Sequence, residues 1–213
     1  MSSIASAEGP EGRALLRPFR RGDEADLADI CLRTGDGGAD ATGLYRSSGL
    51  LADIFVLPYV AKHLDAAFVI DDGQRVVGYV VCAPDTAAFE RWFRYEWWPP
   101  REEGHRRAAG DSAKDAAMLR YAAAIGGRPV PFVDEHPAHL HIDLLPEAQG
   151  SGWGRALIDA LVQDLGRRGI PGLQLTAGGT NTGAIAFYRR IGFTELRRTP
   201  GGVTFGRPIA AVR

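Results

Sequence analysis

The sequence predicts an α/β protein of the α+β kind, in which helices flank a mixed, mostly antiparallel central sheet. Three observations indicate this fold. The stretch AAFVIDDGQRVVGYVVCA has the pattern of a β-hairpin that turns at Asp72-Gly73. Between His139 and Gly192, strand-like and helix-like segments alternate, and two further strand-like segments follow. With 213 residues, 45% of them hydrophobic, the chain is long enough for one domain with a full core.

The start of the chain predicts a leader, a strand and a helix. Residues 1–12, rich in Gly, Ser, Ala and Glu, are expected to form a disordered leader before a single domain spanning 13–213. ALLRPF at 14–19 has the composition of a short strand. Asp23 is suited to cap a helix that places Leu27 on its buried side.

A second helical region follows a glycine-rich break. The loop from Gly35 to Tyr45 ends the first helix and is a candidate wall of a cleft. Residues 46–64 then carry apolar side chains at helical spacing. We expect this region to begin at Ser47 or Ser48 and to kink or end near Pro58.

Residues 84–137 are expected to form a helical, aromatic-rich insertion between the third and fourth strands. The segment is irregular, with the breaker Pro99-Pro100, a charged run and an Ala-rich helix-like stretch. Three tryptophans either wall a cleft that sets substrate specificity or pack the insertion onto the sheet: Trp92, Trp97 and Trp98. Four glutamates would suit a cationic acceptor but are interleaved with arginines and discriminate little: Glu90, Glu96, Glu102 and Glu103.

The C-terminal half predicts alternating strands and helices. HLHIDLL is strand-like by its alternation of polar and apolar residues, and Pro146 ends it before a run of glycines. The expected order is a strand at 139–145, a helix at 152–167, a strand at 172–177, a helix at 181–192, and an antiparallel pair at 193–198 and 201–209.

The net charge, the signal patterns and the cysteines of the sequence indicate which partners, which location and which cysteine state to expect. The formal net charge is −1, which gives no general attraction to nucleic acid or to an anionic membrane, so neither is an expected partner. The chain shows no secretory signal pattern and no apolar run long enough to span a bilayer, so a cytoplasmic location is expected. Cys31 and Cys82 lie in apolar segments and are expected to be reduced core residues.

QGSGWGRALI, residues 149–158, joins a glycine-rich turn to the start of a helix, directly after a strand. Free backbone N–H groups and the positive end of a helix dipole make such a turn an anion site. A dinucleotide loop would need G-x-G-x-x-G and a later acidic residue, and a mononucleotide loop would need Lys-Ser/Thr where this chain has Arg155-Ala156. Both classes are therefore disfavoured, and a purely structural tight turn remains the alternative.

Two motifs of the C-terminal half stand in a characteristic order and separation. PEAQGSGWGRALI contains Gln149-x-x-Gly152-x-Gly154, and one strand–helix unit later N-x-x-A-x-x-F-Y-x-x-x-G-F begins at Asn181. Together they resemble the GCN5-related N-acetyltransferase (GNAT) superfamily. LRPFRRGDEADLADICLRTGDGG, the aromatic insertion and HLHIDLLPEAQGSG also look like the acetyltransferase-like C-terminal domain of O-GlcNAcase and its stand-alone bacterial relatives.

The resemblance implies a GNAT-like sheet and an acyltransferase that uses acetyl-CoA (coenzyme A) as co-substrate, with no metal. Acetyl is expected to pass directly to a small-molecule or peptide amine in a ternary complex. The pyrophosphate of CoA would lie on backbone N–H groups of the glycine loop, with the pantetheine arm between two splayed strands. The residues expected to bind the cofactor are Leu144, Leu145, Gln149, Gly150, Ser151, Gly152, Trp153, Gly154, Arg155, Asn181, Ala184, Phe187 and Tyr188.

Tyr188 is the candidate general acid, because the equivalent Tyr of the family's motif points at the sulfur. A phenol with a pKa of about 10 can protonate a thiolate while remaining protonated at neutral pH. The alternative is a packed aromatic on an amphipathic helix beside Phe187. Asn181 is expected to cap the same helix and, by the resemblance, to bond the pantetheine amide as well. Arg155 can meet a phosphate.

The strand at 139–145 carries the other candidate catalytic residue. His139, His141 and Asp143 alternate and therefore share one face. Asp143 is the candidate base, acting on the amine directly or through water. The three side chains also suggest a metal triad, but same-face neighbours on a strand are nearly 7 Å apart, roughly twice the rise per residue, so a polar cleft is favoured. A bulge near Ile142 to Leu145 would free a backbone N–H to bind the carbonyl oxyanion.

The interpretation that competes with an enzyme is a non-catalytic acetyl-CoA-binding or interaction module with the same fold. Neither cysteine lies in a setting that activates a nucleophile, which disfavours a covalent enzyme intermediate. The identity of the acceptor and the oligomeric state are left open by the sequence.

Overall fold

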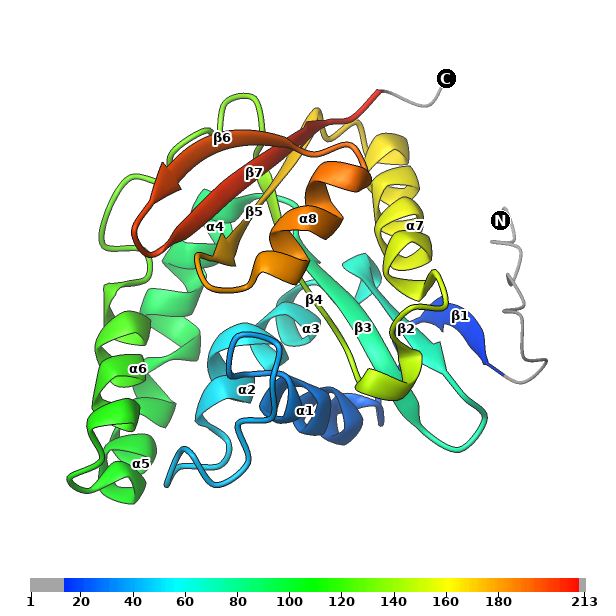
Figure 1. The fold of residues 1–213 in the computed structure, drawn as a ribbon. Helices are drawn as coiled ribbons and strands as arrows, with labels where there is room; N and C mark the ends of the chain where they lie inside the picture. The colour runs from blue at the N-terminus through cyan, green and yellow to red at the C-terminus, as the bar shows by residue number, and fades with distance from the viewer. Residues whose placement is uncertain (1–13, 211–213) are drawn as a thin grey trace.

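The computed structural model describes residues 14–210 and contains one seven-stranded sheet with the order β1-β2-β3-β4-β5-β7-β6 (Figure 1). Neighbouring strands run antiparallel except for β4 and β5, which are parallel. This confirms the mixed, mostly antiparallel sheet. The strands are β1 (Leu15–Pro18), β2 (Ala67–Asp71), β3 (Val76–Ala83), β4 (Ala138–Leu144), β5 (Gly172–Gly178), β6 (Thr194–Thr199) and β7 (Gly202–Pro208). The predicted leader at 1–12 lies outside the described residues.

Helices surround this sheet, and those between β3 and β4 form the predicted insertion. The α-helices are α1 (Glu24–Arg33), α2 (Leu50–Phe55), α3 (Leu57–Lys62), α4 (Thr86–Trp92), α5 (Pro99–Ala109), α6 (Ala113–Ala124), α7 (Trp153–Arg167) and α8 (Thr182–Arg190). Shorter helical turns lie at Leu64–Ala66 and Pro146–Ala148, and a π-helical turn at Phe93–Trp97 links α4 to α5. Within residues 14–210, no helix is long and apolar enough to cross a membrane.

α1 begins at Glu24 with Asp23 in the N-cap position, as predicted, but neither Asp23 nor Ser47 caps a helix with its side chain, because each side chain bonds another partner. The Asp23 carboxylate makes no cap bond to α1 and instead accepts two hydrogen bonds from the Arg17 guanidinium, at 2.7 and 2.9 Å. The second helix begins after Gly49, and the Ser47 hydroxyl bonds His105 Nδ1 at 2.7 Å. The predicted kink near Pro58 is confirmed, since the region divides at Val56 into α2 and α3.

The tryptophans pack the insertion onto the rest of the molecule. Trp98 is buried between the rings of Phe93 and His105, with centroids 5.8 and 5.6 Å away. Trp97 donates its indole N–H to the carbonyl of Asp53 in α2 at 2.8 Å. Of the two alternatives drawn from the sequence, packing is the one that these contacts support.

β4 has two different faces. The Tyr79 hydroxyl of β3 donates to Asp143 Oδ2 at 2.5 Å, on the face that α1 covers with Cys31. On the other face Leu144 approaches the first turn of α7 at Gly154. The alternation predicted for this strand is therefore confirmed, and it sends the polar residues and the apolar residues to opposite layers.

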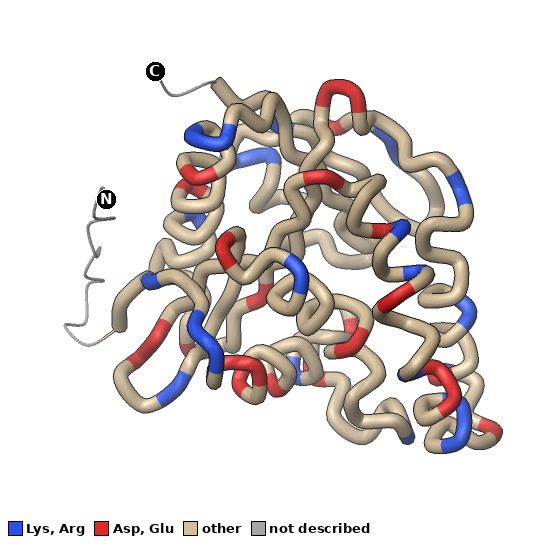
Figure 2. The backbone as a smooth tube through the Cα atoms, turned by 180° about the vertical axis from the view of Figure 1, so that it is seen from behind, with Lys and Arg blue, Asp and Glu red and all other residues tan. Residues whose placement is uncertain are grey.

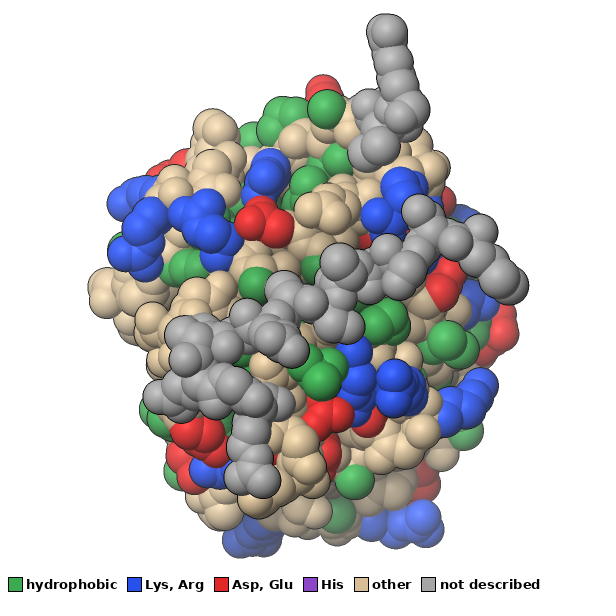
Figure 3. All heavy atoms as spheres, turned by 90° about the vertical axis from the view of Figure 1, so that its right-hand side faces the viewer, with side chains coloured by type: hydrophobic (Ala, Val, Ile, Leu, Met, Phe, Trp, Pro, Cys, Tyr) green, Lys and Arg blue, Asp and Glu red, His purple; other side chains and the backbone are tan. Residues whose placement is uncertain are grey.

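Charged side chains are mixed over the surface. Seen from behind in Figure 2, basic and acidic positions are scattered along the backbone among uncharged ones, and the face drawn in Figure 3 carries small basic and acidic groups side by side. Cys31 and Cys82 are both buried and free, as the sequence predicts.

Candidate active site

A cavity of about 290 Å³ opens where β4 and β5 diverge. The two strands pair only at Ala138 with Leu173 and at His139 with Gln174. Beyond that point their edges separate, and the cavity lies between them, bounded by α8 and by the loop that follows α1. The sequence-predicted residues that line it are Asp143, Asn181, Ala184 and Tyr188.

Backbone N–H groups of β4 are free because β4 and β5 separate, and not because of a bulge. The register between β3 and β4 is unbroken from Ala83 and His139 to Gly78 and Leu144. In an antiparallel ladder alternate residues bond the partner strand, and Leu145 N–H bonds the Val77 carbonyl at 2.9 Å. The N–H groups of even-numbered residues such as Ile142 and Leu144 therefore point toward the open side.

Two expectations are corrected by this geometry. The predicted bulge is absent from the pairing of β3 with β4 in the described structure, so the amides are released by strand divergence instead. Leu145, predicted to contact the cofactor, offers no free group. Its N–H bonds Val77, its carbonyl accepts from Ala148 N–H at 2.9 Å, and its side chain is fully buried.

The glycine loop presents a row of free amides. Within the part of the chain that the structure describes, no backbone N–H from Gly150 to Arg155 has a hydrogen-bond acceptor. Gly150 and Gly152 have φ values of 78° and 87°, and no atom lies within 4 Å of where a Cβ would stand on either. Positive φ favours glycine, and the open space beside it leaves room for a ligand. These amides also surround the N-terminus of α7, so the loop fits a pyrophosphate.

Side chains of α8 and of the loop itself hold this turn in place. The Gln149 side chain donates to the Leu144 carbonyl at 2.9 Å, which ties the loop to the end of β4. A Cβ on Gly154 would lie 3.1 Å from the Phe187 ring, so glycine allows α7 and α8 to approach closely. Trp153 is buried, whereas Arg155 and Ser151 are exposed beside the free amides.

Tyr188 points from α8 into the cavity wall and is 7% exposed. Phe193 and Phe205 lie against its ring, with centroids 5.6 and 5.7 Å away. Burial raises the pKa of this phenol above its usual value, and the nearby Asp143 charge raises it further. Tyr188 therefore holds its proton at neutral pH.

Asp143 faces the same cavity from β4. Burial raises the pKa of its carboxyl to about 6, while the hydrogen bond from the Tyr79 hydroxyl opposes that rise. The carboxylate form consequently predominates above pH 6, where it can accept a proton. Tyr79, which fixes the Asp143 carboxylate, was not among the residues singled out from the sequence, because strand register decides which residue lies opposite which.

His139 and His141 line the deeper part of β4 as neutral imidazoles. Burial lowers the pKa of His139 to about 3 and that of His141 to about 4. Thr86 donates its hydroxyl to the Pro137 carbonyl at 2.6 Å, so His139 Nδ1–H must donate to Thr86 Oγ1 at 2.9 Å. His139 Nε2 then accepts from the Tyr59 hydroxyl at 2.5 Å. Residues 14–210 contain no group of three side chains placed to hold a metal ion.

Asn181 caps α8, which is one of the two roles expected of it. Its Oδ1 accepts from Ala184 N–H at 2.9 Å, which confirms that it caps α8. Its amide nitrogen lies at the cavity beside Gly38, from the predicted loop wall between Gly35 and Tyr45. This nitrogen is free to donate a hydrogen bond into the cavity.

A second cavity, of about 200 Å³, adjoins the first. It extends from β4 and β5 toward the insertion, and it receives Phe89, Glu90 and Tyr121 from α4 and α6. None of the three tryptophans considered from the sequence lines it. The residues that line both cavities are Phe55, Leu140, His141, Leu175 and Thr176. The two spaces therefore meet at the point where the strands separate.

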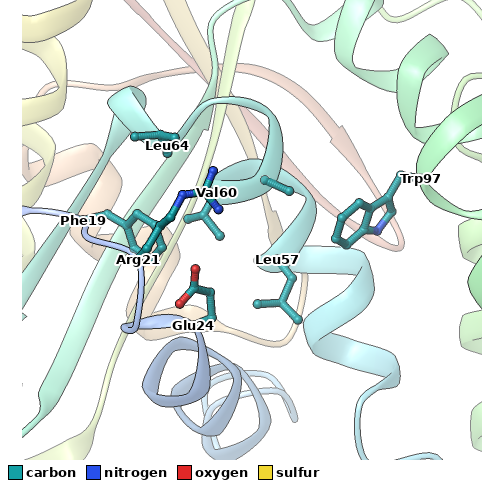
Figure 4. A pocket seen from close by; sticks show the side chains of 8 residues that line it. Phe19, Arg21, Glu24, Leu57, Val60, Leu64 and Trp97 are labelled. Carbon is teal, nitrogen blue, oxygen red and sulfur yellow. The ribbon is translucent and has the colours of Figure 1, made fainter.

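A further cavity of about 230 Å³ lies away from this region, between the β1–α1 loop and α3 (Figure 4). It is mainly apolar, with Leu57, Val60 and Trp97 on its walls and Arg21 and Glu24 at its edge (Figure 4). It contains none of the residues predicted to act in catalysis or to bind a cofactor.

Comparison with known proteins agrees with the geometry. The model of the acetyltransferase (GNAT) family matches residues 45–193, which is well over half of the chain and includes the glycine loop and Tyr188. This chain belongs to the GNAT family. It is accordingly an acyltransferase, and the family resemblance drawn from the two motifs is confirmed.

The chain is also similar to individual proteins and solved structures. A crystal structure titled SsHAT is 36% identical, covers 92% of this chain and 98% of its own, and superposes with a TM-score of 0.82. Protein O-GlcNAcase of Rattus norvegicus is 24% identical over 191 residues, 87% of this chain, but the match spans only 20% of that protein's length. The ribosomal protein bS18-alanine N-acetyltransferase of Escherichia coli K12 is 39% identical over 75 residues, 34% of this chain and 51% of its own.

Proposed function

We propose that this GNAT acyltransferase transfers acetyl from acetyl-CoA directly to an amine, within a complex that holds both substrates at once. The observation that carries the proposal is the cavity between β4 and β5, which brings Asp143 and Tyr188 together beside released backbone amides. Acetyl-CoA is the acetyl donor general to the family, and N-acetylation is the family's general activity.

The chain's own groups fit acetyl-CoA along its length. The six free amides of the glycine loop suit the pyrophosphate, and Arg155 stands beside them. The open edge of β4 and the Asn181 amide nitrogen supply hydrogen bonds for the amides of the pantetheine arm. An amide of β4 on this open side is also suited to hold the thioester carbonyl oxygen as its charge grows.

The reaction forms an amide C–N bond and breaks the thioester C–S bond. One proton must leave the nitrogen and one must reach the sulfur. Asp143 is ionised above pH 6 and accepts the proton of the nitrogen, directly or through water. Tyr188 is held protonated by burial and donates to the departing sulfur. The buried thiols of Cys31 and Cys82 have raised pKa values, which disfavours a covalent acetyl-cysteine route.

The test is Tyr188→Phe, which keeps the packed ring and removes the phenol. We expect kcat to fall by about 100-fold, a typical loss for one general acid, while acetyl-CoA binds with unchanged affinity. Thiol release and mass spectrometry of the product measure turnover over a panel of amines, and calorimetry measures binding. Tyr95→Phe, at a tyrosine that is 70% exposed, is the matched control and should leave both quantities unchanged.

Two outcomes would contradict the proposal. If Tyr188→Phe turned over at the wild-type rate, Tyr188 would not be the general acid. Acetyl-CoA binding without turnover of any amine by the wild-type protein would instead favour the non-catalytic binding module.

A further inference from the structure

The second cavity holds one carboxylate without a charged partner. Glu90, on α4, accepts a hydrogen bond from Gly126 N–H at 3.1 Å and forms no ion pair in the described structure. Arg91, the next residue of α4, is exposed and lines neither cavity. Arg94, one turn further along, is engaged elsewhere, since its guanidinium donates to the carbonyls of Ala123 and Ile125 at 3.1 and 3.4 Å. The lining of the cavity contains no Lys or Arg side chain.

Aromatic rings line the same cavity as this carboxylate. The Tyr59 and Phe89 rings stack with centroids 4.4 Å apart, and Phe55 and Tyr121 lie 5.5 Å apart on the same cavity. Burial raises the pKa of Glu90 above its usual range. A cation bound in the cavity would relieve the cost of the buried negative charge, and aromatic faces attract cations as well. The walls thus select a positive group.

The other end of the second cavity, at His141, carries no charge. His141 borders both cavities, and its imidazole makes no hydrogen bond to any described residue. It is neutral at physiological pH, so it can accept a hydrogen bond but would repel no amine. An amine against His141 lies where the second cavity meets the first, which is the side from which it can reach the thioester. A group against Glu90 lies in the second cavity only.

We propose that the second cavity is the acceptor site and that its occupant is a compact diamine. One amine, uncharged, lies against His141 and receives the acetyl group, while the second, an ammonium, lies against Glu90. The proposal rests on the acetyl transfer proposed above and names its substrate class. A new amide bond forms at the first nitrogen and the thioester C–S bond breaks. The proton of the nitrogen passes to Asp143, and the departing CoA sulfur takes a proton from Tyr188. The second nitrogen keeps its charge throughout.

The experiment compares three acceptors of similar length with the full chain and acetyl-CoA: 1,4-diaminobutane, n-butylamine and 4-aminobutanoate. A hydrogen-bonded contact to a charged group contributes about 1.5–3 kcal/mol, so we expect kcat/KM for the diamine to exceed that for butylamine by roughly 10- to 100-fold. The carboxylate of 4-aminobutanoate meets Glu90 and should make it the poorest acceptor of the three.

Glu90→Gln keeps the size of the side chain and an acceptor for Gly126 N–H, but removes the charge. We expect it to bring kcat/KM for the diamine down to about that for butylamine. Glu96→Gln is the matched control, because Glu96 is exposed on the same insertion and lines neither cavity. It should keep the full preference for the diamine.

Equal kcat/KM for the diamine and butylamine in the wild type, or a preference that survives Glu90→Gln, would overturn the proposal. Failure of the proposed acetyl transfer has a different signature, namely no thiol release with any acceptor. Calorimetric titration of 1,4-diaminobutane into the CoA-saturated protein then decides the matter. Binding that weakens at least 10-fold in Glu90→Gln supports the diamine site, and no binding to the wild type overturns it.

Discussion

At the scale of single residues, the chemistry depends on where burial places each polar group. Asp143 and Glu90 are both carboxylates in cavities, and burial raises the pKa of each. Asp143 receives a hydroxyl hydrogen bond from Tyr79 at 2.5 Å, whereas Glu90 receives a backbone N–H and borders the aromatic rings. Asp143 is thereby suited to exchange a proton, and Glu90 is suited to hold a cation.

The environment of Asp143 predicts how activity depends on pH. Because burial raises its pKa to about 6, the carboxylate is lost as the pH falls through 6, and kcat should fall with it. Asp143→Asn should lower kcat by at least about 100-fold and remove this acidic limb. The measurement is kcat between pH 5 and 8 at saturating substrates, by thiol release. An unchanged limb in the variant would assign it to another group.

Tyr79 is expected to act through Asp143 as a positioning residue. Its hydrogen bond favours the carboxylate, so Tyr79→Phe should raise the pKa of Asp143 and move the acidic limb of kcat upward by about one pH unit. A purely structural role would lower the melting temperature and leave the pH profile in place.

At the scale of elements, the start of α7 is the part of the fold that we propose binds the cofactor. In the described structure, the glycine loop and the first residues of α7 leave six backbone amides without acceptors, and glycines with positive φ shape the loop. These features are local, since a helix N-terminus always has free N–H groups and glycine adopts positive φ readily. This explains why the sequence alone indicated an anion site there.

The two ends of α7 allow a controlled test. Gly152→Ala strains a residue at φ 87° by about 1 kcal/mol and places a methyl group in open space beside the amides. We expect the Kd for acetyl-CoA to rise at least 10-fold. Gly169→Ala carries the same kind of strain at φ 70°, also in open space, but at the far end of the helix. Calorimetry should show weaker acetyl-CoA binding only for Gly152→Ala. An equal loss of acetyl-CoA affinity in both variants would contradict pyrophosphate binding by the amides at the start of α7.

At the scale of the whole molecule, long-range contacts join the insertion to the rest of the protein. Asp115 of α6 is fully buried and accepts hydrogen bonds from the N–H groups of Arg46 and Ser47, at 3.1 and 2.9 Å. Ser47 in turn bonds His105 of α5, and His105 Nε2 contacts Asp53 of α2 at 2.9 Å. This network fixes α5 and α6 against the segment from which Phe55 enters the second cavity.

Asp115→Ala would leave the buried N–H of Ser47 and the partly buried N–H of Arg46 without acceptors. At roughly 1–3 kcal/mol for each buried group, we expect the free energy of unfolding to fall by about 3 kcal/mol. Urea denaturation followed by tryptophan fluorescence measures the change. Asp111→Ala is the control, because the Asp111 side chain is 86% exposed and pairs only with Arg46 at the surface, so it should cost less than about 1 kcal/mol. Equal effects of the two variants would refute the anchoring role of Asp115.

The sequence by itself determined the features that depend on near neighbours in the chain. The hairpin at Asp72-Gly73, the polar–apolar alternation of β4, the glycine loop and the Asn181 cap all follow from local backbone geometry. Local signals erred where a distant partner competed, as at Ser47, whose hydroxyl bonds His105, 58 residues later in the chain, and does not cap the helix.

Only the tertiary structure decided how the active site is assembled. The divergence of β4 from β5 frees amides without a bulge, and strand register places Tyr79 against Asp143, 64 residues later in the chain. Four glutamates of the insertion are equivalent in sequence, yet Glu102 and Glu103 pair with arginines one helical turn away while Glu90 enters a cavity. The physical reason is that burial in a cavity and strand pairing arise between segments far apart in the chain, which the local sequence pattern does not encode.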